Sequence, residues 1–132
     1  MIVHEVEQNT PEWHALRVIP TASVATQLVS NNGKVSTQIT GLAESLAGDR
    51  FAGEPIDNWE GNAATDRGHL FEAEARDAYA FLYDAEPEIV GFITDSRKQY
   101  GCSPDSLIGE DGMLEIKCQL KKGHVSSLVY YK

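Results

Sequence analysis

Three charged residues in the C-terminal third of the chain have the types and spacing of a metal-dependent hydrolytic site. Asp105 follows a proline, and nine residues separate it from Glu115, which lies two positions before Lys117. Two carboxylates held a few ångströms apart repel each other unless a cation joins them. Hard oxygen ligands select Mg²⁺ or Mn²⁺, and a lysine beside such an ion orients or deprotonates a water and offsets phosphate charge. The pattern therefore predicts metal-assisted chemistry at phosphate.

A β-hairpin is the simplest element that brings these three side chains together. Residues 109–112 read GEDG, a strong turn signal, and residues 113–118 alternate between apolar and polar as a half-buried strand does. A hairpin over this turn brings Asp105 beside Glu115. Because side chains alternate along a strand, Glu115 and Lys117 share one face, and the apolar residues between them point into a core.

The order Pro-Asp, spacer, Glu-X-Lys is similar to the signature of the PD-(D/E)XK metal-dependent nucleases. This signature fixes only a few residues, so it also occurs by chance in unrelated proteins. The alternative is a surface hairpin with a Glu–Lys pair and no metal site. The longer string CSPDSLIGEDGMLEIKC resembles the core of the YqaJ-like viral recombinase family, which includes the phage lambda exonuclease and typically reads C-S-P-D-G-L, then L-E-[IL]-K-C-P. Ser106 and Gln119 depart from the family's Gly and Pro.

A second motif lies near the N-terminus. Thr10-Pro11-Glu12 predicts a helix start, and the following residues resemble the family pattern E-W-x-x-x-R, then T-A-S. The resemblance implies that Arg17 and Ser23 bind the 5′ phosphate of a DNA strand. A guanidinium clamps phosphate, and a helix N-terminus with a hydroxyl favours anions. Between the two parts of this motif the family usually has a short segment with a Gly, and this chain has residues 18–20 there instead. The alternatives are core packing for Trp13 and helix capping for Ser23.

A third motif lies on the longest expected helix, Asn62–Tyr83. Residues 67–76 resemble the family pattern R-G-x-x-x-E-x-x-A-R, and the resemblance implies that Glu72 completes the metal site. The alternative is an exposed Glu72 that pairs with Arg76 one helical turn later. Apolar residues recur at helical spacing and predict the buried face: Leu70, Phe71, Ala75, Ala78, Tyr79 and Leu82.

The resemblance runs from Thr10 to about His124 and implies an α/β fold with a restriction-endonuclease-like PD-(D/E)XK core. We expect one domain over residues 1–132, C-terminally short relative to the family, with N-terminal helices packed on a small mixed β-sheet. Sequence patterns predict further helices over 11–17, 22–29 and 36–51. They predict strands over 88–94, 100–108 and 113–120, with a strand or extended lead-in over 2–7.

The composition fits a soluble globular chain of 132 residues with 42% hydrophobic residues. The absence of a long apolar stretch or a signal-peptide pattern predicts a cytoplasmic protein, of phage or prophage origin by the resemblance. Cys102 and Cys118 are expected as small buried residues. The net charge of −9 requires that cations be focused along one groove if the chain binds DNA. The candidates are Arg17, Lys117, Lys121, Lys122 and His124, with Arg67 and Arg76, although Lys121 and Lys122 also fit a solvated turn.

Together, the resemblance implies a metal-dependent deoxyribonuclease, a phage-type 5′→3′ exonuclease that acts on linear DNA in recombination. Asp105, Glu115 and the carbonyl of Ile116 would hold Mg²⁺, or Mn²⁺, and Glu72 would complete the site. Lys117 would position the attacking water. The implied partners are DNA and a single-strand annealing protein, with the family's ring-shaped homotrimer as the assembly. The alternative is a catalytically inactive truncated homologue that binds DNA or a recombinase. The acidic charge favours this hypothesis, and the intact set of Asp105, Glu115, Lys117 and Glu72 argues against it.

Overall fold

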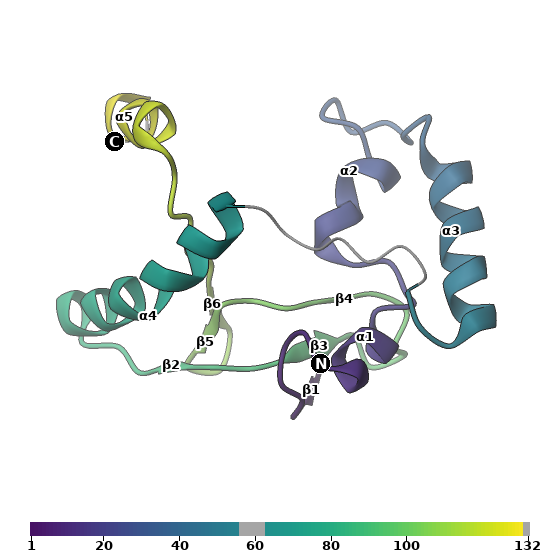
Figure 1. The fold of residues 1–132 in the computed structure, drawn as a ribbon, viewed down its shortest axis with the longest axis horizontal. Helices are drawn as coiled ribbons and strands as arrows, with labels where there is room; N and C mark the ends of the chain where they lie inside the picture. Colours follow the sequence, from purple (N-terminus) through teal and green to yellow (C-terminus); the bar gives the residue numbers. More distant parts are fainter. Residues whose placement is uncertain (56–62, 131–132) are drawn as a thin grey trace. The chain divides into compact units, whose positions relative to one another are not determined.

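The computed structural model describes residues 1–55 and 63–130, which form two compact units (Figure 1). The first unit contains residues 1–55 and 89–104. The second contains residues 63–88 and 105–130. Each unit has its own three-stranded sheet and its own helices.

The helices of the first unit begin largely where the sequence predicts. In α1 (Pro11–Leu16), Pro11 occupies the first turn and the Thr10 hydroxyl accepts the backbone N–H of Trp13 at 3.3 Å. The helix expected after Thr21 is instead a 3₁₀ turn, η1 (Ala22–Val24), followed by the short α2 (Ala25–Leu28). The last helix, α3 (Ile39–Ala52), ends at a glycine with a left-handed φ of 83°.

The sheet of the first unit has the order β1-β3-β4 and is antiparallel. Its strands are β1 (Ile2–His4), β3 (Phe92–Thr94) and β4 (Gly101–Cys102). Helix α1 packs against β3 through a buried cluster of Trp13, Ile19 and Phe92, with Val6 and Leu16 at its margin. This cluster confirms the alternative that Trp13 is a core residue.

Backbone contacts fix the position of Trp13 within this core. Its indole Nε1–H donates to the carbonyl of Gly91 at 3.1 Å and to the hydroxyl of Ser103 at 2.9 Å. A side chain at Gly91 would place a Cβ 1.7 Å from the carbonyl oxygen of Val6, so only glycine fits where these two segments cross.

The second unit combines a long helix with an antiparallel sheet in the order β2-β5-β6. Its elements are α4 (Ala63–Tyr83), β2 (Pro87–Glu88), β5 (Ser106–Ile108), β6 (Gly112–Leu114) and α5 (Lys121–Tyr130). In the β5–β6 hairpin, Leu107 pairs with Met113, and Gly109 has a left-handed φ of 58° in the turn. The predicted hairpin is therefore present.

The strands do not form the single mixed sheet that was expected. They form two antiparallel sheets, and each sheet lies in a separate unit. The predicted strand over 88–94 divides at Gly91 into β2 and β3. The arm over 100–108 divides at Pro104, which has no N–H for a ladder, into β4 and β5. The arm over 113–120 is a strand only to Leu114, and helix α5 follows where no helix was predicted.

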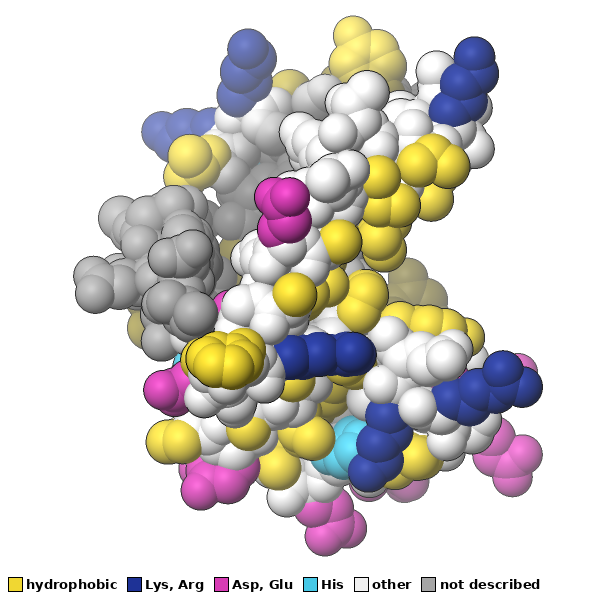
Figure 2. Space-filling view, turned by 90° about the vertical axis from the view of Figure 1, so that its right-hand side faces the viewer, with side chains coloured by type: hydrophobic (Ala, Val, Ile, Leu, Met, Phe, Trp, Pro, Cys, Tyr) yellow, Lys and Arg dark blue, Asp and Glu magenta, His cyan; other side chains and the backbone are white. Residues whose placement is uncertain are grey.

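Helix α4 confirms the strongest predicted helix, although its expected start at Asn62 lies outside the described residues. Phe71, Ala75 and Tyr79 are half-buried, as predicted. Leu70 and Leu82 are 73% and 71% exposed, so their assignment to the buried face was wrong; Ala78 is exposed as well. Figure 2 shows hydrophobic side chains at the surface beside charged ones. Among the described residues, no helix has the length and apolarity to cross a membrane.

Candidate functional site

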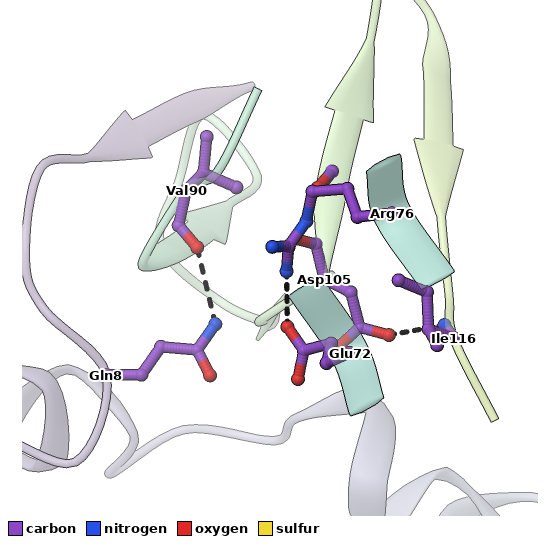
Figure 3. Close-up of polar contacts among 7 residues, drawn as sticks. Gln8, Glu72, Arg76, Val90, Asp105 and Ile116 are labelled. Carbon is purple, nitrogen blue, oxygen red and sulfur yellow. Dashed lines mark hydrogen bonds and ion pairs between the residues drawn. The ribbon is translucent and has the colours of Figure 1, made fainter. Parts of the chain in front are cut away.

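The β5–β6 hairpin of the second unit positions the predicted carboxylates. Asp105 immediately precedes β5, and Ser106 pairs with Leu114 in the ladder. One further step of the same register places Asp105 across from Glu115. The Oδ2 atom of Asp105 accepts the backbone N–H of Ile116, which fastens the carboxylate to the opposite arm (Figure 3).

The opposite arm keeps the expected alternation even though its strand ends early. Glu115 and Lys117 are exposed, whereas Leu114 and Ile116 are half-buried. The Lys117 ammonium donates to Oε1 of Glu115 in an ion pair. This hydrogen bond raises the pKa of Lys117, burial lowers it, and the charges of Glu115 and Asp105 raise it further. Lys117 is therefore a cation at neutral pH, on the face that carries the carboxylates.

Glu72 lies on α4 and pairs with Arg76 one turn later, as the alternative interpretation predicted (Figure 3). The surroundings differ from that alternative, because the Glu72 side chain is only 28% exposed and that of Arg76 only 13%. Arg76 also donates from Nε to the Ser106 hydroxyl at 2.9 Å. Helix α4 is thus tied to the strand that begins beside Asp105.

The donor chemistry at the hairpin fits a divalent cation. The side chains of Asp105 and Glu115 and the carbonyl of Ile116 offer only oxygen, which suits Mg²⁺, an ion that keeps several waters and takes few protein ligands. Among the side chains that the structure describes, no three from His, Cys, Asp or Glu are grouped closely enough to hold a metal. The structure thus places Asp105 and Glu115 on the two arms of one hairpin and holds Glu72 against Arg76, and it does not group the three acids.

The two residues predicted to bind phosphate lie together in the first unit. Arg17 Nη2 donates to the Ser23 hydroxyl at 3.4 Å, and the hydroxyls of Thr21 and Ser23 are hydrogen-bonded at 2.8 Å. Burial lowers the pKa of Arg17, yet an arginine remains charged in proteins. A guanidinium beside two hydroxyls is an arrangement that binds an oxyanion.

Two further residues contact the predicted phosphate-binding pair, Trp13 at Arg17 and Thr21 at Ser23, and sequence reasoning gave neither of them this role. The Arg17 guanidinium stacks 4.1 Å from the centre of the Trp13 ring. Thr21, the residue before η1, makes no capping hydrogen bond with its side chain, and its hydroxyl contacts that of Ser23 instead. The four-residue spacing of Trp13 and Arg17 on a helix was the available signal, since it puts both on one face. Ile19, one of the three residues that stand where the family usually has a Gly-containing segment, is buried against Trp13.

The predicted cationic groove is only partly described. Lys121, Lys122 and His124 are exposed at the start of α5. The alternative of a solvated turn at Lys121 and Lys122 was right about their exposure and wrong about the turn, because both lie in the helix. The side chain of Arg67 lies outside the described residues. Arg17 belongs to the first unit, and Arg76 is committed to contacts within the second.

A cavity of about 660 Å³ in the first unit borders Thr21, the residue that is hydrogen-bonded to Ser23. Its wall is mostly apolar and includes Pro20, Leu28, Ile93 and Tyr100. Neither Arg17 nor Ser23 lines it. Cys102 lies in its wall, and both Cys102 and Cys118 are free thiols that are half-buried, less enclosed than the expected buried residues.

The sequence model of the YqaJ-like viral recombinase domain matches residues 12–132. The chain belongs to this family. No curated protein matches the chain. The crystal structure of an alkaline exonuclease, LHK-Exo, from Laribacter hongkongensis superposes with a TM-score of 0.75 at 30% identity. The match covers 93% of this chain and 60% of that chain. LHK-Exo in complex with dAMP superposes with a TM-score of 0.73, again at 30% identity and with the same coverage of both chains.

Membership in the YqaJ-like family confirms the predicted fold class, in which helices and small sheets form a PD-(D/E)XK-like core. The matched residues include all three motifs, from Trp13 through Arg76 to Lys117. This chain spans about 60% of the length of the matched exonuclease chains.

Proposed function

We propose that this chain is the nuclease domain of a phage-type exonuclease, which hydrolyses linear DNA from the 5′ end with Mg²⁺. The hairpin carries this proposal, because it sets Asp105 across from Glu115 with Lys117 on the face of Glu115. Family membership and the similarity to an alkaline exonuclease support the same activity. DNA is the proposed substrate; the annealing protein and the homotrimer stay predictions.

The carboxylates of Asp105 and Glu115 and the carbonyl of Ile116 would hold Mg²⁺, with Mn²⁺ as a substitute. When bound, such an ion polarises the phosphate and lowers the pKa of a bound water. The hydrogen bond from the Ile116 N–H fixes one oxygen of Asp105 and so sets the direction of the other. Glu72 would complete the site from α4.

Lys117 would act through its charge. Its ammonium already lies against Glu115, and its raised pKa keeps it protonated. A fixed cation beside the scissile phosphate stabilises the negative charge that develops in the transition state, and its N–H groups orient the attacking water.

The direct test is digestion of end-labelled linear duplex DNA. We expect nucleotides to be released with Mg²⁺ and not with EDTA, and closed circular duplex to resist, because an exonuclease needs an end. A folded protein that leaves linear DNA intact with Mg²⁺ and with Mn²⁺ would contradict the proposal and favour the DNA- or recombinase-binding alternative.

A 5′ phosphate on the substrate should matter through Arg17. We expect wild type to prefer 5′-phosphorylated over 5′-hydroxyl ends and Arg17→Gln to lose about tenfold or more of that preference, since hydrogen bonds to charged groups contribute about 1.5–3 kcal/mol. Ser23→Ala should have a smaller effect of the same kind. The measurement is the ratio of digestion rates on the two substrates.

The matched control is Arg97→Gln, which removes an exposed arginine from the turn after β3. Its rate ratio should equal that of wild type. If Arg17→Gln kept the wild-type ratio while binding DNA normally, Arg17 would not be the phosphate clamp.

A further inference from the structure

Arg76 contacts both the helix and the strand that carry the predicted metal-site acids. Its Nη2 donates to the Glu72 carboxylate and lies 3.4 Å from the carbonyl oxygen of Asp105. Its Nε donates to the Ser106 hydroxyl at 2.9 Å. These three contacts lie within the second unit, and Figure 3 shows the one with Glu72.

The contacts of Arg76 are largely shielded from solvent. The Arg76 side chain is 13% exposed and Ser106 is fully buried. The Ser106 hydroxyl donates in turn to the carbonyl of Asp105 at 2.5 Å. A continuous set of hydrogen bonds therefore runs from the Glu72 carboxylate through Arg76 and Ser106 to the backbone of Asp105.

We infer that Arg76 is a positioning residue for the proposed cation site: it fixes the backbone of Asp105, whose carboxylate would be a ligand, and it holds the Glu72 carboxylate on α4. The inference rests on the proposed function, because it concerns the same metal site. Ser106, which stands where the family usually has Gly, supplies this chain's own link between Arg76 and Asp105.

The physical reason lies in what a carboxylate needs in order to bind a metal. A side chain that contacts a metal ligand restricts its rotation, and removing such a partner typically weakens metal binding about tenfold to a hundredfold. Arginine suits this role because its planar fork donates in several fixed directions at once. Lysine offers a single ammonium and cannot reach Glu72 and Ser106 with the same geometry.

The test measures metal binding directly and needs no cleavage. The apo protein is titrated with Mn²⁺ and with Mg²⁺ by calorimetry, for wild type, Arg76→Met and Arg76→Lys. We expect Arg76→Met to weaken binding about tenfold to a hundredfold, and Arg76→Lys to fall between it and wild type. Thermal unfolding followed by circular dichroism verifies that each variant is folded.

A double-mutant cycle separates positioning from a purely structural role. In a Glu72→Gln background, the effect of Arg76→Met on metal affinity should shrink, because the carboxylate that Arg76 holds has been removed, and only the part that acts through Asp105 should remain. Ser106→Ala removes the hydrogen bond from Arg76 Nε but leaves the contact of Nη2 with the Asp105 carbonyl, so it should weaken binding by a smaller factor. Arg97→Met, at an exposed turn, should leave the affinity unchanged.

The outcomes distinguish this inference from the proposed function. Equal affinity of wild type and of a folded Arg76→Met or Arg76→Lys would overturn the positioning role and leave the nuclease proposal standing. Strictly additive effects of Glu72→Gln and Arg76→Met would also overturn it. A wild-type protein that binds neither cation would overturn the metal-dependent function itself, and the inference with it. If Arg76→Met does not fold, the metal affinities of Arg76→Lys and Ser106→Ala test the positioning role in its place.

Discussion

Lys117→Ala is expected to reduce Mg²⁺-dependent digestion of linear DNA by about 10²–10³-fold, the usual loss when one stabilising group is removed from a charged transition state. The fold should be unaffected, because the Lys117 side chain is 67% exposed and its partner Glu115 is 55% exposed. Exposed ion pairs contribute little to stability. The measurement is the initial rate of nucleotide release at saturating Mg²⁺.

The control for this prediction is Lys34→Ala, which removes an exposed lysine from the first unit. It should digest DNA at the wild-type rate and unfold at the wild-type temperature. Because the proposal assigns Lys117 to the chemistry and not to the metal ligands, Mn²⁺ binding should survive Lys117→Ala. Digestion at the wild-type rate by Lys117→Ala would contradict the role assigned to this residue.

The hairpin that carries this site was predictable because its signals are local. The GEDG turn selects the connection between the strands, and the alternation after it sets which side chains share a face. Glu115 and Lys117 are exposed and Ile116 is half-buried, as period two requires. The N-terminal cap at Thr10 was predictable for the same reason.

The division of the strands between two sheets was not predicted, because strand pairing depends on partners far away in the sequence. Strand β1 pairs with β3, some 90 residues later, and β2 pairs with β5. Gly91 and Pro104 mark the two breaks, but each residue also fits a bend within one strand. Helix α5 was missed because Gly123, Val125 and Val129 weaken its helical signal.

The contacts around Glu72 show a different limit. Four-residue spacing on a helix predicts the pair with Arg76. It does not reveal that the same guanidinium also reaches Ser106 on β5, because that contact depends on how α4 packs. The pair with Arg76 is the one that the alternative interpretation predicted, although both side chains are less exposed than that alternative requires. The role of Glu72 in a metal site stays a prediction.

Asp105→Asn is expected to remove metal binding while preserving the hairpin. Asparagine has nearly the same shape, and its side-chain carbonyl still accepts the N–H of Ile116, so the contact between the two arms survives. The charge that attracts Mg²⁺ is lost. We expect digestion to fall by about a thousandfold, since a metal ion contributes several kcal/mol to the stabilisation of transition-state charge.

The matched control is Asp111→Asn, which removes the same charge from the exposed turn of the same hairpin. It should keep wild-type digestion and wild-type Mn²⁺ affinity, whereas Asp105→Asn should lose both without a change in unfolding temperature. Digestion rates and calorimetric titrations of both variants provide the comparison. Equal behaviour of the two variants would show that position 105 matters only through general charge, and the metal site would then have to lie elsewhere in the chain.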